Sequence, residues 1–340
     1  MGIKSILYIT NSVSAKDFTL VGPVQYLYVY GLRRLLGENN VKLTNKINIK
    51  DIENYDAILI GRDLLDNLTT RNITNSIINK YSCRKVLSIL DTEEDLLVDK
   101  IIYNNNIKCY IKREIPNFFI NKKILKRYLM SFLNRKFNVV FLSEYIKFYN
   151  KDLLIPCPLT YHLLNKELIE KTFSTKKYLV SYITNLHPAT GNLFGRLYRY
   201  EIHKERIKLA AIARSVPNSF VRLGYGLPGS GLPFEQYCKI ISESYSSLNT
   251  TAYDNYRRYE ITYLGSVLIS ERPLDITPND FIEGKHAFFY DNIKELKSIL
   301  KDLKGREDEL IKMGREAREH AIKYHSPEAR AKTILEALNK

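Results

Sequence analysis

Short runs of apolar residues recur along the whole chain, and they constrain its fold more than any other feature. In the first half the strand candidates are SILYIT (5–10), DAILIG (56–61), KVLSIL (85–90), KCYIK (108–112) and NVVFLS (138–143). In the second half they are KYLVSYIT (177–184), SFVRLG (219–224), SYSSLN (244–249), VLIS (267–270) and AFFY (287–290). Continuously apolar strands are covered on both faces, as parallel strands are. The sequence therefore predicts an α/β fold with parallel sheets.

Helical patterns separate these strands, which is typical of α/β layers. They include 24–36, 120–137, 196–215 and a helix beginning at residue 234, followed by a short helix near 258 and three terminal helices. The last begins at Ser326-Pro327, a serine cap followed by a proline. The strand pattern stops near Pro156 and Pro158 and restarts near Lys177. We predict two Rossmann-like domains, 1–170 and 171–325, and a C-terminal helix, 326–340, packing back on the first domain.

The composition is that of an ordinary globular protein, with 45% hydrophobic and 26% charged residues. Apolar runs are too short for a membrane-spanning helix, and the first residues indicate a strand rather than a signal peptide. The 4 cysteines, Cys83, Cys109, Cys157 and Cys238, are not spaced as metal ligands. We expect buried free thiols, no metal site and a cytoplasmic location.

The net charge of +15 predicts an anionic partner: a nucleotide, a nucleic acid, an acidic glycan or a membrane surface. Nucleic-acid binding is the less favoured alternative, because no recognised nucleic-acid-binding motif is present. The basic amphipathic helix expected from Phe118 to Phe137 can lie on an anionic membrane, at its inner face. A core-facing helix with a solvated basic face is the more common outcome and is favoured.

The segment RRYEITYLGSVLISERP (257–273) combines a helix start, a glycine and a buried strand. A cation suits a diphosphate, a carboxylate can accept hydrogen bonds from ribose hydroxyls, and a glycine lets the backbone approach a ligand. Taken singly, Arg258 and Glu260 also fit a solvated helix surface, and Gly265 fits a helix end.

Several segments together resemble the GT-B glycosyltransferases, in the family-1-like branch that includes the spore-maturation CgeB type. They are KKYLVSYITN (176–185), FEQYCKIISESYSSLN (234–249), RRYEITYLGSVLISE (257–271), NDFIEGKHAFFYDNIKELKSIL (279–300) and CYIKREI (109–115). The resemblance implies two Rossmann-like domains with sheets facing across a cleft. It also implies transfer of a sugar from a nucleotide-sugar donor to a glycan, lipid-linked or protein acceptor, without a metal or other cofactor.

The resemblance also implies donor-binding residues, mainly in the second domain. Glu260 would accept hydrogen bonds from the ribose, and Arg258 would contact the diphosphate or base. Thr184 ends the domain's first strand, Asn185 and His187 lie in the loop that follows it, and Gly265 ends the helix. Thr184 stands where the family has a phosphate-loop glycine.

Two residues are the predicted catalytic groups, Asp91 and His286. Asp91 ends a strand, and an inverting transfer needs a base for the acceptor hydroxyl. Asp17, Asp63 and Glu114 are further candidates for that base. The alternatives stay open: Asp91 as part of an acidic helix start or of a GT-A metal motif, and His286 as a polar loop residue. A GT-A fold would not explain the restart at Lys177. The chain can also be an inactive GT-B relic that binds a partner.

Overall fold

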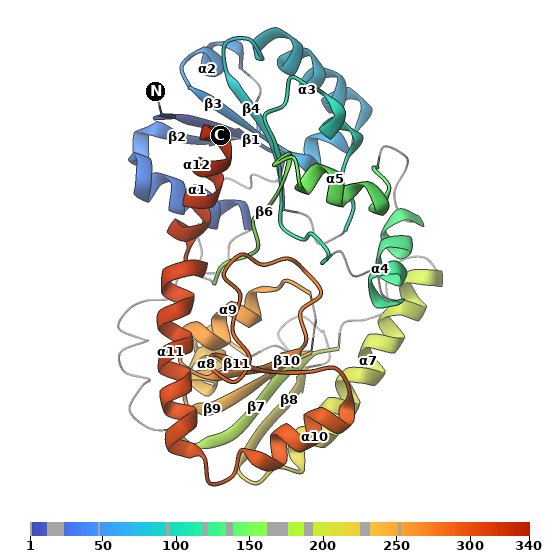
Figure 1. Ribbon diagram of the computed structural model, residues 1–340, viewed down its shortest axis with the longest axis vertical. Coiled ribbons are helices and arrows are strands. Elements are labelled where there is room, and N and C mark those ends of the chain that lie inside the picture. Colours follow the sequence, from blue (N-terminus) through green and yellow to red (C-terminus); the bar gives the residue numbers. More distant parts are fainter. Residues whose placement is uncertain are drawn as a thin grey trace. The chain divides into compact units, whose positions relative to one another are not determined.

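The computed structural model describes residues 2–11, 24–46, 48–92, 96–117, 122–133, 139–161, 176–186, 193–224, 232–250 and 253–340 (Figure 1). The chain forms two compact units. The first consists of Met1–Thr160, Asp275–Pro278 and Ser326–Lys340, and the second of Tyr161–Leu274 and Asn279–His325. Each unit is built on one parallel sheet, which confirms the α/β prediction.

The first sheet has the order β2-β1-β3-β4-β5-β6. Its strands are β1 (Ile6–Ile9), β2 (Val41–Thr44), β3 (Ala57–Gly61), β4 (Val86–Asp91), β5 (Tyr110–Lys112) and β6 (Leu154–Pro156). Strand β1 pairs with β2 on one side and β3 on the other. The chain therefore reverses its direction across the sheet after β2, and the switch point lies between β1 and β3.

The helices of the first unit are α1 (Val24–Leu36), α2 (Ile49–Glu53), α3 (Leu68–Tyr81), α4 (Lys122–Leu133), α5 (Tyr145–Tyr149) and α12 (Pro327–Asn339). Short 3-10 turns cover Glu38–Asn40, Arg62–Leu65, Lys100–Tyr103 and Leu142–Glu144. The predicted cap of the last helix is confirmed, since Ser326 Oγ accepts a hydrogen bond from Ala329 N at 3.1 Å.

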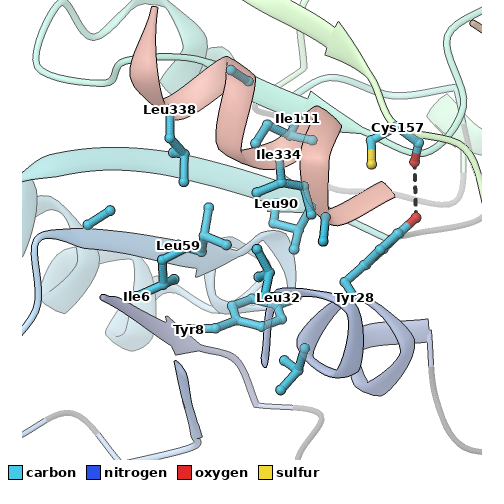
Figure 2. Packing of buried hydrophobic residues seen from close by; sticks show 14 of the residues in the cluster. Ile6, Tyr8, Tyr28, Leu32, Leu59, Leu90, Ile111, Cys157, Ile334 and Leu338 are labelled. Atoms are coloured by element: carbon cyan, nitrogen blue, oxygen red, sulfur yellow. Dashed lines mark hydrogen bonds between the residues drawn. The ribbon is translucent and has the colours of Figure 1, made fainter. Parts of the chain in front are cut away.

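The C-terminal helix α12 completes the core of the first unit by packing beside α1. Figure 2 shows Ile334 of α12 beside Leu90 and Ile111 of the sheet, and Leu338 belongs to the same buried cluster. The Tyr28 hydroxyl of α1 donates to the carbonyl of Cys157 at 3.0 Å. The last residues of the chain thus fill the core built by the first.

The second sheet has the order β11-β10-β9-β7-β8. Its strands are β7 (Tyr178–Asn185), β8 (Ser219–Gly224), β9 (Ser244–Asn249), β10 (Val267–Glu271) and β11 (Ala287–Tyr290). Its helices are α7 (Leu193–Arg214), α8 (Phe234–Ser242), α9 (Tyr256–Tyr263), α10 (Ile293–Asp302) and α11 (Glu307–His325). Strand β7 lies between β8 and β9, so the switch point of this sheet lies between β7 and β9.

A line of buried hydroxyls crosses the second sheet. Ser181 Oγ and Ser247 Oγ are 2.7 Å apart, and Ser247 Oγ and Ser266 Oγ are 2.8 Å apart. Helix α11 approaches closely at the same level, because a Cβ on Gly314 would lie 2.5 Å from the carbonyl oxygen of Gly265. Each hydroxyl is paired, so the burial of these polar groups is compensated.

Two sequence expectations were wrong, and two strands, β2 and β6, were not expected. Of the segment expected as a strand at 138–143, the described residues 139–143 form none: Val139 makes one antiparallel bridge with Asp99, and a 3-10 turn follows. The place beside β5 is taken by β6, which ends in Pro156 and lies at the sheet edge, where a missing N–H is tolerated. Strand β2 was not expected because its alternating residues mark a half-exposed edge. Cys83, expected to be buried, is exposed.

Replacing Gly31 by alanine tests the packing of α12 on α1. The new Cβ would collide with the backbone carbonyl of Pro327, so the two helices must move apart. We expect a loss of about 1–3 kcal/mol in unfolding free energy, despite the better helix propensity of alanine. Urea unfolding measures it, with Gly2→Ala as control, where the Cβ would meet only Asn339 at 3.8 Å. Equal stability of the Gly31 variant would contradict the packing described.

Candidate functional site

Some of the polar side chains that the sequence singled out, Arg258 and Glu260 among them, lie near the carboxyl edge of the second sheet. Helices α8 and α9 follow β8 and β9, so both begin at the edge where these strands end. Asn255 caps α9, accepting a hydrogen bond from Arg258 N at 3.1 Å. In open α/β sheets ligands bind outside the carboxyl ends of the strands at the switch point. The starts of α8 and α9 are therefore the first place to look for a ligand site.

Glu260 lies on the second turn of α9, with 6% of its surface exposed. The hydroxyl of Tyr237, on the first turn of α8, donates to Glu260 Oε2 at 3.1 Å. Burial, and then the charge of Glu260, raise the pKa of Tyr237 well above its ordinary value. The phenol therefore stays protonated and holds the carboxylate in place as an acceptor. Sequence reasoning missed Tyr237, because its partner lies 23 residues away on another helix.

Arg258 makes different contacts from Glu260. It is 2% exposed, and Nη2 forms an ion pair with Asp280. Its guanidinium carbon lies 5.7 Å from the centre of the Phe281 ring and 5.9 Å from that of Phe289. A buried arginine paired in this way ties α9 to the segment that leads into β11.

The remaining predicted donor-binding residues are only partly brought together. Thr184 is buried in β7, and Asn185 ends that strand and accepts a hydrogen bond from Arg206 through its carbonyl. Both lie at the carboxyl edge, whereas His187 lies outside the described residues. Gly265 follows the other end of α9 with a φ of 73°, and its carbonyl accepts from Lys176 Nζ at 2.8 Å. It therefore lies at the amino edge of the sheet, away from Thr184.

His286 is buried in the turn before β11. Its Nδ1 accepts a hydrogen bond from Ile282 N at 3.2 Å, and its ring centre lies 4.3 Å from that of His320. Burial lowers the pKa of His286 to about 4, and the His320 charge acts in the same direction. His286 is therefore neutral at physiological pH and serves the turn as an acceptor.

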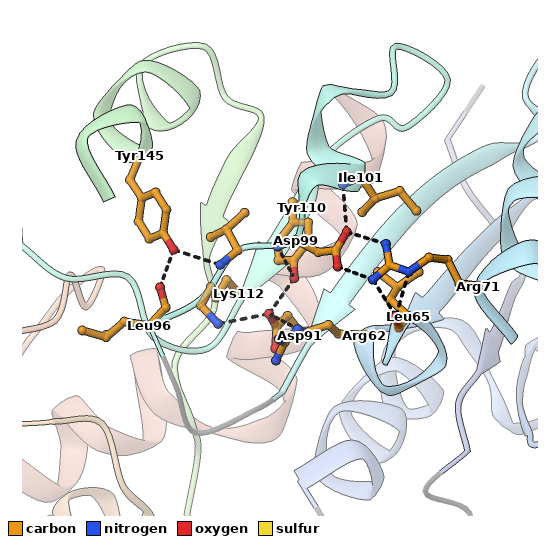
Figure 3. A network of polar contacts seen from close by, with 11 residues as sticks. Arg62, Leu65, Arg71, Asp91, Leu96, Asp99, Ile101, Tyr110, Lys112 and Tyr145 are labelled. Atoms are coloured by element: carbon orange, nitrogen blue, oxygen red, sulfur yellow. Dashed lines mark hydrogen bonds and ion pairs between the residues drawn. The ribbon is translucent and has the colours of Figure 1, made fainter. Parts of the chain in front are cut away.

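Asp91 is the centre of a buried ionic network in the first unit (Figure 3). Its Oδ2 accepts from Tyr110 Oη at 2.7 Å and from Lys112 Nζ at 3.0 Å, and Arg62 Nε lies at 3.6 Å. The carboxylate is completely buried. Asp91 ends β4, whereas the switch point of this sheet lies between β1 and β3.

Asp63 is the carboxylate beside that switch point. Its Oδ2 accepts from Thr10 Oγ1, just beyond β1, at 2.8 Å, and its side chain is partly exposed. Gly61 makes this arrangement fit, because a Cβ there would collide with Asp63 and Thr10. Of the other candidate bases, Glu114 is buried against Arg127 at 2.5 Å and Asp17 lies outside the described residues.

Within the described ranges, no three His, Cys, Asp or Glu side chains come together in a way that could hold a metal ion. The same ranges contain no helix long and apolar enough to cross a bilayer.

Residues 205–336 match the family model described as glycosyl transferase-like. This match spans less than half of the chain, and it contains α8, α9, α10 and α11 with Tyr237, Arg258 and Glu260. No curated protein matches the chain.

Three solved structures illustrate the fold similarity. Sucrose-phosphate synthase from Thermosynechococcus elongatus is 11% identical over 97% of each chain, with a TM-score of 0.56. Anabaena Alr3699/HepE, in complex with UDP, is 10% identical over 98% of this chain and 99% of its own, with a TM-score of 0.49. TarM is 12% identical over 84% of this chain, with a TM-score of 0.45, and this chain spans 55% of TarM. The fold is α/β of the GT-B type, with two Rossmann-like domains.

The neutral state of His286 predicts a pH-dependent stability. Its folded pKa of about 4 lies below the ordinary value of 6.5, so the unfolded chain binds more protons between these values. Stability should therefore fall as pH drops from 6.5 to 4, by about 1–2 kcal/mol with partial screening by water.

Replacing His286 by asparagine keeps an acceptor for Ile282 N and removes the titration. Urea unfolding at several pH values should give a flatter dependence in this variant than in the natural protein. An unchanged slope would show that His286 does not cause the pH dependence.

Proposed function

We propose that the protein is a glycosyltransferase that takes its sugar from a nucleotide-sugar donor and belongs to the CgeB-type branch. One observation carries this proposal: Glu260 and its partner Tyr237 lie at the switch point of the sheet in the part of the chain that matches the glycosyl transferase-like model. A buried carboxylate held by a neutral phenol is suited to accept hydrogen bonds from the two ribose hydroxyls of a nucleotide.

The reaction breaks the bond between the sugar's anomeric carbon and the diphosphate, and forms a bond from that carbon to an acceptor oxygen. The nucleoside diphosphate leaves with the electron pair, and the acceptor hydroxyl gives its proton to a base. Asp91 was the predicted base; its ion pairs with Lys112 and Arg62 leave the partly exposed Asp63 as the carboxylate to compare with it. A role of His286 near the donor stays a prediction, as does independence of metal ions.

The acceptor class stays open within the proposal: a glycan, a lipid-linked molecule or a protein. We assign it to the first unit, in keeping with the resemblance. Location in the cytoplasm, with peripheral contact at the inner membrane face, belongs to the same proposal.

Helix α4 supports the membrane part of the proposal. Lys122, Leu125, Lys126 and Leu129 share one face by their spacing, and all are exposed, the leucines by 46% and 48%. The apolar face formed by Ile124 and Tyr128 is buried instead. Leucines set among lysines suit a surface of anionic lipid headgroups.

Glu260→Gln tests the donor site while keeping the size of the side chain. Isothermal titration calorimetry with UDP, GDP, ADP, TDP and CMP, with and without Mn²⁺, should find one preferred nucleotide without a need for metal. The variant should bind this nucleotide about 10- to 100-fold more weakly, because that loss of affinity corresponds to the loss of a hydrogen bond to a charged group. The 2′-deoxy form should show a much smaller difference between the two proteins.

Glu295→Gln, on the exposed side of α10, is the matched control and should bind like the natural protein. If no nucleotide binds, the glycosyltransferase proposal fails. Steeply salt-dependent binding of DNA or RNA would then favour the nucleic-acid alternative. If DNA and RNA do not bind either, the inactive relic would be favoured.

The double change Leu125→Ser and Leu129→Ser tests the membrane contact. Co-sedimentation with vesicles containing phosphatidylglycerol should capture the natural protein at low salt and much less of the variant, because apolar insertion is lost. Leu68→Ser removes an even more exposed leucine, at 74%, from α3 and should change nothing. Equal capture of all three proteins, or capture of none, would rule out docking through α4.

A further inference from the structure

Two adjacent arginines begin α9, and the structure gives them different surroundings. Arg258 is buried and paired with Asp280 between two aromatic rings. Arg257 is partly exposed, and within the described part of the chain its guanidinium forms neither a hydrogen bond nor an ion pair. The sequence cannot separate the two, because both stand in the same run of charged and aromatic residues.

Helix geometry places Arg257 with Glu260 rather than with Arg258. Residues three apart lie on the same face of a helix and are displaced by about 4.5 Å along its axis. Arg257 is on the first turn of α9, nearer the carboxyl edge of the sheet, and Glu260 is one turn further in. A cation and a carboxylate therefore follow one another along one face at the switch point.

Two buried tyrosines report where the charge of Arg257 acts. Burial raises the pKa of Tyr182, in β7, to about 12, and the positive charge of Arg257 opposes that rise. Arg257 also opposes the increase at Tyr237, the residue that holds Glu260. Because such an effect needs proximity, the charge of Arg257 lies near β7, which borders the switch point, and near α8.

We propose that Arg257, rather than Arg258, binds the diphosphate of the nucleotide-sugar donor, next to the ribose held by Glu260. The inference rests on the proposed function and assigns the anionic part of that site. A planar guanidinium that has no carboxylate partner among the described residues can bind two phosphate oxygens at once. The ribose and the diphosphate adjoin in a nucleotide, as Glu260 and Arg257 adjoin along α9.

The same contact would assist departure of the leaving group. Negative charge grows on the diphosphate as the bond to the sugar breaks, and a fixed cation stabilises it. Arg258 cannot take this role without losing its pair with Asp280, and its contribution is to hold α9 in position.

The experiment compares Arg257→Gln with Arg258→Gln as a matched pair. Calorimetry uses three ligands of the preferred base: the nucleoside, its monophosphate and its diphosphate. Arg257→Gln should weaken binding of the diphosphate by about 10- to 100-fold. It should weaken binding of the monophosphate less, and it should leave binding of the nucleoside unchanged. Its melting temperature should equal that of the natural protein, whereas Arg258→Gln should melt several degrees lower. Arg257→Lys should bind the diphosphate more tightly than Arg257→Gln but less tightly than the natural protein, because lysine keeps the positive charge but lacks the planar guanidinium.

The possible outcomes separate this inference from the proposal beneath it. If Glu260→Gln weakens binding of the nucleoside diphosphate but Arg257→Gln does not, the assignment of Arg257 is wrong and the proposed function stands. An equal loss for all three ligands would mean that Arg257 shapes the site without binding phosphate, which also overturns the assignment. If the natural protein binds no nucleoside diphosphate, both proposals fail.

Discussion

The parallel pairing of the strands is the constraint on which the rest of the structure depends. Each parallel connection must return across the sheet, so a helix that connects two strands begins at the edge where the first of them ended. This places the start of α8 with Tyr237 and the start of α9 with Glu260 at one edge. The strand order reverses between β7 and β9, and open α/β sheets bind their ligands at such a point. The topology thus sets the position of the proposed donor site, and particular side chains supply its binding groups.

Charged groups in this protein serve both the fold and the proposed site, and burial distinguishes the two uses. Asp91 with Lys112 and Arg258 with Asp280 are pairs in which at least one partner is almost completely buried, and removing one partner would strand a charge in the interior. Glu260 and Arg257 belong to the other kind, where a carboxylate is held by a neutral hydroxyl and a cation is partly exposed. The proposed donor site uses groups of this second kind.

The chain crosses between its two units more often than a simple division into halves requires. Residues 275–278 return to the first unit, where Ile276 N donates to the carbonyl of Ile115 at 2.7 Å. The chain returns again at Ser326 and adds α12 to the first core. The serine and proline at 326–327 signal the second return locally. The first has no such signal, because it depends on backbone pairing between segments far apart in the sequence.

The sequence by itself determined the class of fold, because apolar strands and helix caps are local patterns that can be recognised without knowing the tertiary contacts. It placed β7 to β11 within about a residue, and it marked Glu260 through its spacing from Arg258 and Gly265. Only the tertiary structure decided which charges are used within the fold. Arg257 and Arg258 are equivalent in sequence, and Asp63 and Asp91 both follow strands. Their different partners, such as Asp280 for Arg258 and Thr10 for Asp63, come from other parts of the chain, and such pairings arise only when the chain is folded.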